Sequence, residues 1–156
     1  MSEIYNMAGH LVRRLHQISV AVFTERMNEL GFDITPVQYA ALTAIRENPG
    51  IDQATLAGAI AYDKATIGGV VDRLAAKGVI LRGRSKTDKR ARALSLTEQG
   101  EALVMQARPF IRALQTDILS GLDPDEEAQF MALLAKTTAA GNTRSRAPLR
   151  RREEKT

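Results

Sequence analysis

The chain has 156 residues, of which 44% are hydrophobic and 26% charged, as is typical of a folded domain with its own core. It has no cysteine, which excludes disulfides, thiolate chemistry and zinc held by cysteine, and its two histidines make any other metal site improbable. No apolar run approaches the roughly 18 residues that a membrane-spanning helix needs. The start Met1-Ser2-Glu3 lacks the basic and apolar regions of a signal peptide. We therefore expect a soluble cytoplasmic protein without metal or cofactor.

The net charge of +4 is unevenly distributed. Residues 144–156 carry six Lys and Arg against Glu153 and Glu154, so the rest of the chain is about neutral. Within that rest, residues 77–92 carry seven Lys and Arg against the single acid Asp88. A basic cluster in a neutral body is a candidate phosphate-binding surface, although a solvated polar loop has the same composition.

Two helices are predicted in the first fifty residues. Apolar residues at helical spacing predict the first over residues 4–30, with Gly31 at its C-terminal end. Thr35 and Pro36 are an N-cap and a first-turn proline for a second helix, which ends near Asn48-Pro49-Gly50.

A short third helix is predicted to begin after Asp52, followed by a turn over residues 58–62. Asp63 is the candidate N-cap of a fourth helix over 64–77, which Gly78 ends. Residues 79–81 and 93–96 read as two short strands of a β-hairpin around the charged loop 82–92, which should project from the body.

Two further helices are expected near the C-terminus. The first begins after Thr97 and should be kinked by Pro109, and the second begins at Asp123-Pro124. From Gly141 onward little can be buried, and we expect disorder. The predicted fold is mainly α (α+β): a winged helix-turn-helix lobe over 35–96, a helical dimerisation region formed by 1–34 and 97–140, and a disordered basic tail over 141–156.

The third and fourth helices resemble a helix-turn-helix, whose second helix lies in the major groove with its N-terminal residues at the base edges. Gly68 and Gly69 each destabilise the helix by about 1 kcal/mol relative to Ala. Glycine is expected there if DNA must approach the helix backbone closely, and a close crossing of two core helices would explain it equally. Arg73 could contact phosphate, or pair with Asp72 or a carboxylate of the wing. The candidate DNA contacts of this helix are Lys64, Ala65, Thr66, Gly68, Gly69 and Arg73.

The basic hairpin follows the recognition helix directly and could reach the neighbouring minor groove. Arg90 is the candidate for insertion there, and Asp88 could hold its guanidinium in an extended pose. Arg84, Lys86 and Lys89 would contact phosphates. Because the helix has glycines where longer side chains could read bases, we expect the wing and the shape of the DNA to supply much of the affinity.

The segment Asp52–Gly100 resembles the MarR family of bacterial regulators. The resemblance rests on Asp72-Arg73-Leu74 with Gly78, Ile80 and Arg82, on Asp88-Lys89-Arg90-Ala91, and on Leu94-Ser95-Leu96-Thr97 followed by Gly100. It extends through Thr35–Leu42 to about residues 5–140. It implies a homodimer that binds a palindromic operator in double-stranded DNA and whose affinity is modulated by a small ligand.

The run from Thr35 to Gly68 is similar to the subgroup that controls the catabolism of aromatic compounds. This implies an aromatic carboxylate or aromatic acyl-CoA as effector, bound between the dimer layer and the DNA-binding lobe. Arg and His can clamp a carboxylate, and Tyr can cover a ring. A polar surface with ion pairs between subunits would have the same composition. The candidate ligand residues are His10, Arg13, Arg14, His16, Gln17 and Tyr39.

Three other classes of protein are alternatives to a ligand-responsive regulator. An enzyme is disfavoured because no nucleophile, base and orienting group cluster together and no glycine loop could cradle a phosphate. A winged-helix module for protein contacts is disfavoured by the charge of the wing. An architectural DNA-binding protein without an effector remains an alternative to a ligand-responsive repressor.

Overall fold

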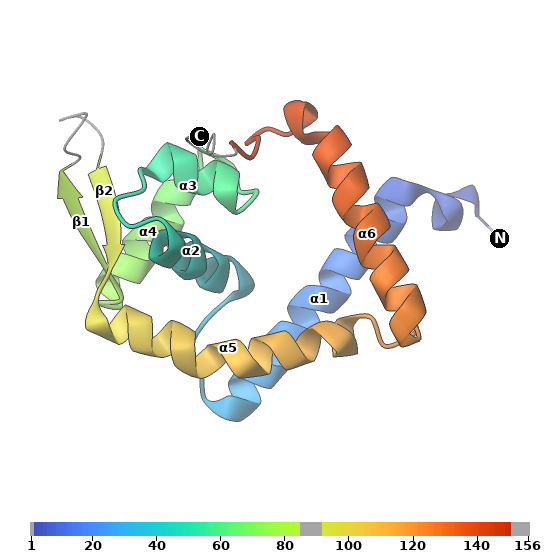
Figure 1. Cartoon of the computed structure of the whole chain (residues 1–156), viewed down its shortest axis with the longest axis horizontal. Coiled ribbons are helices and arrows are strands. Elements are labelled where there is room, and N and C mark those ends of the chain that lie inside the picture. The colour runs from blue at the N-terminus through green and yellow to red at the C-terminus, as the bar shows by residue number, and fades with distance from the viewer. Residues whose placement is uncertain (1, 85–91, 151–156) are drawn as a thin grey trace.

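The computed structural model describes residues 2–84 and 92–150 (Figure 1). Their elements are the short 3-10 helix η1 (Glu3–Asn6), helices α1 (Ala8–Leu30), α2 (Pro36–Glu47), α3 (Gln53–Ala59) and α4 (Ile67–Ala76), strands β1 (Ile80–Arg84) and β2 (Arg92–Leu96), helices α5 (Glu98–Ile118) and α6 (Pro124–Ala140), and the 3-10 helix η2 (Asn142–Arg144). This order confirms the predicted fold class of four helices, a hairpin and two further helices.

The helix ends are set largely by local chemistry that is visible in the sequence. Thr35 and Asp123 each begin a capping box. The side chain of the N-cap residue accepts a hydrogen bond from the backbone N–H three residues later, and the side chain of that later residue accepts one from the backbone N–H of the N-cap. Gly31 and Gly78 follow α1 and α4 with φ of 75° and 74°, a left-handed conformation in which a Cβ would be strained. These predicted starts and stops are confirmed.

The start of α4 differs from the prediction. The helix begins at Ile67, and residues 64–66 form a turn before it. Asp63 does not cap this helix with its side chain: its backbone oxygen accepts the N–H groups of Thr66 and Ile67, while its carboxylate pairs with Arg146 at 3.2 Å. The partner of Asp63 lies 83 positions further along the chain (146 minus 63), so local pattern alone could not reveal it.

The long first helix also differs from expectation. The predicted helix over 4–30 is divided, because Met7 is extended (φ −84°, ψ 130°) and separates η1 from α1. Helix α5 contains Pro109 within a single helix, and the kink expected there stays a prediction. The amphipathic pattern therefore located both helices but did not show the break at Met7.

The strands are longer than predicted and form an antiparallel pair from Ile80↔Leu96 to Arg84↔Arg92. Leu94, in the middle of β2, also exchanges backbone hydrogen bonds with the segment before α3: its N–H donates to Ile51 and its oxygen accepts from Gly50, at 2.9 and 2.8 Å. The base of the hairpin is thereby attached to the helix-turn-helix.

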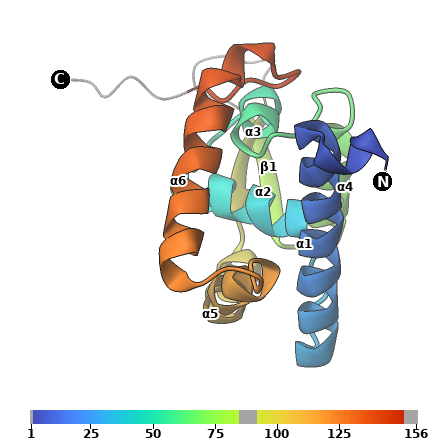
Figure 2. The ribbon, with the colours of Figure 1, turned by 90° about the vertical axis from the view of Figure 1, so that its right-hand side faces the viewer.

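The core lies where α1, α2, α4 and α5 meet the hairpin. Its fully buried side chains include Met27 of α1, Leu42 and Ile45 of α2, Leu74 of α4 and Leu114 of α5. Figure 2 shows α1 and α6 standing to either side of α2, with α5 below. Helices α1 and α5, which come from the two ends of the chain, thus share one core with α2, α4 and the hairpin rather than forming a core of their own.

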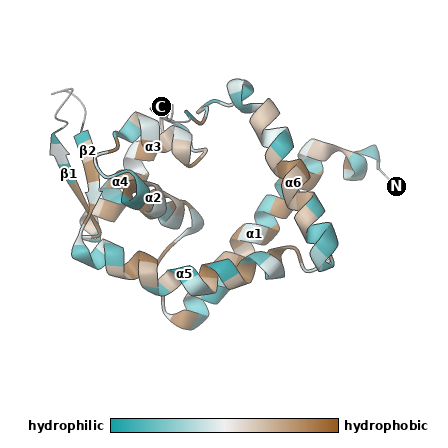
Figure 3. Cartoon of the chain, in the orientation of Figure 1, coloured by the Kyte–Doolittle hydropathy of each residue, from teal (hydrophilic) through white to brown (hydrophobic). Residues whose placement is uncertain are grey.

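Helices α1 and α6 carry hydrophobic residues along their length (Figure 3), and several of the large ones are exposed. Leu11 and Val12 of α1 are 51% and 58% exposed, and Met131 and Leu133 of α6 are 50% and 60% exposed. No residue of α6 is buried. Several large apolar side chains exposed on two neighbouring helices are what a protein interface would cover.

The segment after α6 is ordered up to Arg150, which differs from the expected disorder from Gly141 onward. Ala147 is 4% exposed, and Asn142 makes two hydrogen bonds to the backbone of Leu149, donating from Nδ2 at 2.9 Å and accepting at Oδ1 at 2.8 Å. The physical reason is a long-range contact with α3, which the composition of the segment could not indicate. Residues 151–156 lie outside the described residues.

Candidate nucleic-acid interface and effector cavity

One face of α4 is fixed to the core and the opposite face is open. Ile67, Val70, Val71 and Leu74 are buried, whereas Gly69 and Arg73 are exposed. Lys64, Ala65 and Thr66 are also exposed, in the turn that leads into the helix. Five of the six predicted contact residues therefore lie at the N-terminal end of α4, three of them in the turn before it, whereas Arg73 lies in the last turn of the helix.

The two glycines of α4 are not required by packing within the described part of the chain. A Cβ at Gly69 would meet no atom within 4 Å outside its helix, and one at Gly68 would lie 3.4 Å from the flexible end of Gln53. The alternative explanation, a close crossing of core helices, is therefore not supported. A surface without side chains remains, onto which another molecule can approach the helix backbone.

Asp72 and Arg82 connect the recognition helix to the wing. Arg82 Nη2 lies 2.7 Å from Asp72 Oδ1, joining α4 to β1. This settles one of the alternatives for Arg73, because the carboxylate of Asp72 is paired with Arg82. Arg73 is exposed on the same helix, and its contact with a phosphate stays a prediction, as does its pairing with the wing carboxylate Asp88, which lies outside the described residues.

At the far end of the hairpin two arginines face each other. Arg84 of β1 and Arg92 of β2 are directly paired in the register, and both are exposed. Like charges opposite each other across two strands are destabilising. An anion between or beside them would relieve the repulsion. The other predicted wing residues, Lys86, Asp88, Lys89 and Arg90, lie outside the described residues.

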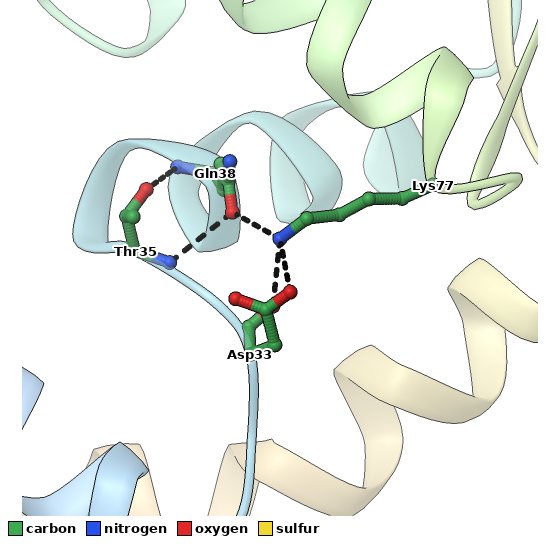
Figure 4. Close-up of polar contacts among 4 residues, drawn as sticks. All are labelled: Asp33, Thr35, Gln38 and Lys77. Atoms are coloured by element: carbon green, nitrogen blue, oxygen red, sulfur yellow. Dashed lines mark hydrogen bonds and ion pairs between the residues drawn. The ribbon is translucent and has the colours of Figure 1, made fainter.

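A polar network attaches the end of α4 to the start of α2 (Figure 4). Lys77 Nζ donates to Gln38 Oε1 at 3.1 Å and to the backbone oxygen of Asp33 at 2.8 Å, and lies 3.2 Å from Asp33 Oδ2. Gln38 is 6% exposed and belongs to the capping box of Thr35. Local sequence patterns do not reveal this network, since Lys77 lies 39 to 44 positions from its partners.

A cavity of about 690 Å³ lies between α1, α2, α5 and α6. Phe23 and Tyr39 form part of its wall, with ring centroids 6.5 Å apart, and Ile111 and Leu114 of α5 form another part. Its polar lining comes from His16, Ser19, Gln115 and Glu127. The volume and the largely apolar wall are typical of a small-molecule site.

The structure places two of the six candidate ligand residues at this cavity, His16 and Tyr39. His10 instead packs edge-on against Tyr5, with ring centroids 5.6 Å apart. Arg13, Arg14 and Gln17 are exposed on α1 and do not line the cavity. The amphipathic spacing placed these residues on one helix but did not show which side of it faces α2 and α5.

Comparison with known proteins identifies the family. A model of the MarR family matches residues 34–91 of the chain. The transcriptional regulator HosA of Escherichia coli is 33% identical over 131 residues, which cover 84% of this chain and 94% of HosA. The chain belongs to the MarR family.

Two other MarR-type relatives inform its role. The HTH-type transcriptional repressor NicR of Pseudomonas putida is 31% identical, over 86% of this chain and 84% of NicR. The structure of BpsR of Bordetella bronchiseptica, described with regulation of its DNA binding by 6-hydroxynicotinic acid, matches with a TM-score of 0.75 and 32% identity, covering 83% of this chain and 97% of BpsR.

These MarR relatives are transcriptional regulators rather than enzymes, and the same coarse function holds for this chain: a DNA-binding regulator with a winged helix-turn-helix. Within residues 2–84 and 92–150, none of the helices has the length and hydropathy of a membrane-spanning segment.

Proposed function

We propose that this MarR-family chain is a repressor that binds a palindromic operator as a homodimer. We further propose that a small aromatic acid, or the acyl end of its CoA thioester, controls this binding from the cavity. The observation that supports this proposal best is the position of the first turn of α2. Pro36 and Tyr39 of this turn line the cavity, and Gln38 of the same turn is hydrogen-bonded to Lys77 at the end of α4.

The DNA-binding part rests on the open end of α4 and on the wing. The exposed turn Lys64–Thr66 can reach phosphates and base edges, and the bare surface at Gly69 permits close approach. Arg84 and Arg92 add positive charge at the end of the hairpin. Few side chains here can read bases, so we expect phosphates and DNA shape to dominate the affinity.

The homodimer is supported by the uncovered apolar faces of α1 and α6. Burying side chains such as Ile18 of α1 and Leu133 of α6, which are exposed and do not line the cavity, between two copies would remove them from water at roughly 25 cal/mol per Å². A two-fold dimer presents two recognition helices to a palindrome, whose half-sites lie about one helical turn apart.

The chemistry of the cavity favours a planar ligand with one polar end. Tyr39 and Phe23 offer aromatic faces, while His16 and Gln115 can hydrogen-bond a carboxyl or hydroxyl group. The arginines that we expected to clamp the carboxylate, Arg13 and Arg14, do not line the cavity of this chain. Hydrogen bonding by His16, rather than an arginine fork, is therefore the proposed means of recognition.

Control would follow from the shared turn of α2. A ligand that moves Pro36 and Tyr39 would also displace Gln38, and through Lys77 the end of the recognition helix. The effector would then favour a state in which the two helices no longer match the half-site spacing. A preference of about 1.4 kcal/mol between the two states changes operator occupancy tenfold.

The test begins by selecting bound duplexes from a randomised DNA library with the full-length protein. The proposal expects a palindromic sequence, bound by two protomers. Benzoate, 4-hydroxybenzoate, 6-hydroxynicotinate and a hydroxycinnamoyl-CoA are then titrated into the complex in a gel-shift assay. Failure to select any duplex would contradict the repressor, and a selected duplex whose affinity no aromatic acid changes would contradict the effector.

A further inference from the structure

The segment after α6 folds back onto the helix-turn-helix. Gly58 of α3 touches it so closely that a Cβ there would lie 2.7 Å from the backbone oxygen of Pro148. Ala147 is buried at the same place, and the two hydrogen bonds between Asn142 and Leu149 close the segment into a loop. Residues 142–150, called the docked segment below, therefore pack at a defined position against α3 (Figure 1).

The docked segment is strongly basic. Residues 142–150 contain Arg144, Arg146 and Arg150 and no acidic residue. All three arginines are exposed, and Arg146 has 86% of its side chain open to solvent. Packing of the segment therefore involves its backbone, Ala147 and Pro148, and leaves the guanidinium groups available to another molecule.

The position of Arg146 indicates which molecule that is. Its Nε lies 3.2 Å from the carboxylate of Asp63, at the start of the turn that leads into α4. The N-terminal end of a recognition helix is the part that enters the major groove. Arg146 thus lies beside the edge of the DNA-binding surface. An exposed ion pair contributes little to stability, so exchanging Asp63 for a DNA phosphate costs little.

We propose that residues 142–150 form an accessory DNA-binding element, in which Arg144, Arg146 and Arg150 contact the phosphate backbone flanking each half-site. This inference rests on the proposed operator binding and adds a second basic surface to the wing. The packing of this segment against Gly58 holds the three arginines at a defined position relative to α4, so that they lengthen the stretch of duplex that the protein contacts.

The first experiment compares wild type with the triple variant R144A/R146A/R150A on two versions of the selected duplex. One version ends at the outer edges of the half-sites, and the other extends by about one helical turn (~10 bp) on each side. On the extended duplex the variant should bind about tenfold or more weakly at 0.15 M salt. The slope of log K against log salt should fall by about one for each lost arginine in each protomer. On the short duplex the two proteins should bind equally.

Arg26→Ala is the matched control, because Arg26 also forms an exposed pair, with Glu29 at 3.2 Å, on a helix outside the winged lobe. It should retain the wild-type slope. An unchanged slope for the triple variant on the extended duplex would overturn the proposal, as would an equal loss on both duplexes. If wild type selects no duplex at all, the operator-binding function itself fails, which is a different outcome.

A second variant separates docking from charge. Gly58→Ala keeps every arginine, but its new methyl group would lie 2.7 Å from the backbone oxygen of Pro148 and would push the segment away from α3. It should weaken binding to the extended duplex and leave the short duplex unaffected, whereas Gly121→Ala, at a glycine with open space around it, should bind as wild type. Wild-type affinity of Gly58→Ala on the extended duplex would overturn the docked element. Thermal unfolding of each variant verifies that it is folded.

Discussion

Lys77, at the end of the recognition helix, and Gln38, in the first turn of α2, share a hydrogen bond of 3.1 Å between Nζ and Oε1. The same amide oxygen accepts the backbone N–H of Thr35 at 3.3 Å, so it serves both the start of α2 and the end of α4. Because Gln38 is buried, losing the lysine leaves a polar group with one partner fewer and little access to water.

The first prediction follows from this bond. Lys77→Met should lower the free energy of unfolding by about 1 kcal/mol, and the pair Lys77→Met with Gln38→Leu should cost less than the sum of the single changes. Urea denaturation of the four proteins in a double-mutant cycle measures this coupling. Strict additivity would contradict a direct interaction.

The second prediction concerns Gly69. Gly69→Ala adds a methyl group in open space, so it should stabilise the free protein by about 0.5–1 kcal/mol while weakening binding to the selected duplex. Gly9→Ala is the matched control, at a helical glycine of α1 that also has open space around it. It should not weaken DNA binding. Gly69→Ala with full affinity would show that DNA does not approach this surface.

The third prediction concerns the two arginines that face each other on the wing. Arg84→Gln removes the repulsion from Arg92, so the free protein should unfold at the same or a slightly higher temperature. Its affinity for DNA should fall, and the slope of log K against log salt should decrease by about one for each protomer. Calorimetry and a salt titration measure the two effects. A loss of stability without a change of slope would assign Arg84 a structural role.

The fourth prediction concerns pH. Partial burial raises the pKa of the Asp52 carboxyl, but its hydrogen bonds from the backbone N–H and the hydroxyl of Thr55, and from the backbone of Ala54, outweigh burial and leave the pKa below its ordinary value. A lowered folded-state pKa stabilises the protein above the unfolded-state pKa of about 3.9, and this stabilisation disappears as the pH falls through the folded value.

Asp52→Ala should therefore cost about 0.5–2 kcal/mol near neutral pH, and the difference from wild type should shrink below about pH 4. Urea unfolding of both proteins at a series of pH values tests this. A difference that does not change with pH would show that the charge of Asp52 contributes nothing to the cap of α3.

Local signals in the sequence were sufficient for most element boundaries. Thr35, Asp123 and Gly31 act within one turn of a helix, and their roles follow from residue type and spacing. The family was likewise apparent from short motifs. What the sequence could not supply depends on long-range contacts. The carboxylate expected to cap α4 at Asp63 instead pairs with Arg146, because the helix begins four residues later at Ile67, and the tail expected to be disordered packs on Gly58.

The candidate sites show the same division. The exposed end of α4 was predictable, because the apolar stripe of the helix shows which face is buried. The cavity was predictable only in part. Helical spacing placed His10, Arg13, Arg14, His16 and Gln17 on α1, but the crossing angles of α1 with α2 and α5 decide which of them face inward, and those angles are not encoded locally. Of these five residues of α1, His16 is the one that lines the cavity.

Blocking the cavity tests the central claim most directly. Ser19 lines the cavity from α1, and Ser19→Phe would occupy part of the ligand's volume. The measurement is the affinity for the selected duplex with and without the aromatic acid that is most active on wild type. Our account predicts that Ser19→Phe binds the duplex but no longer responds to the acid, whereas Thr24→Phe, at an exposed position of the same helix, responds as wild type does. An undiminished response of a folded Ser19→Phe protein would contradict control from this cavity.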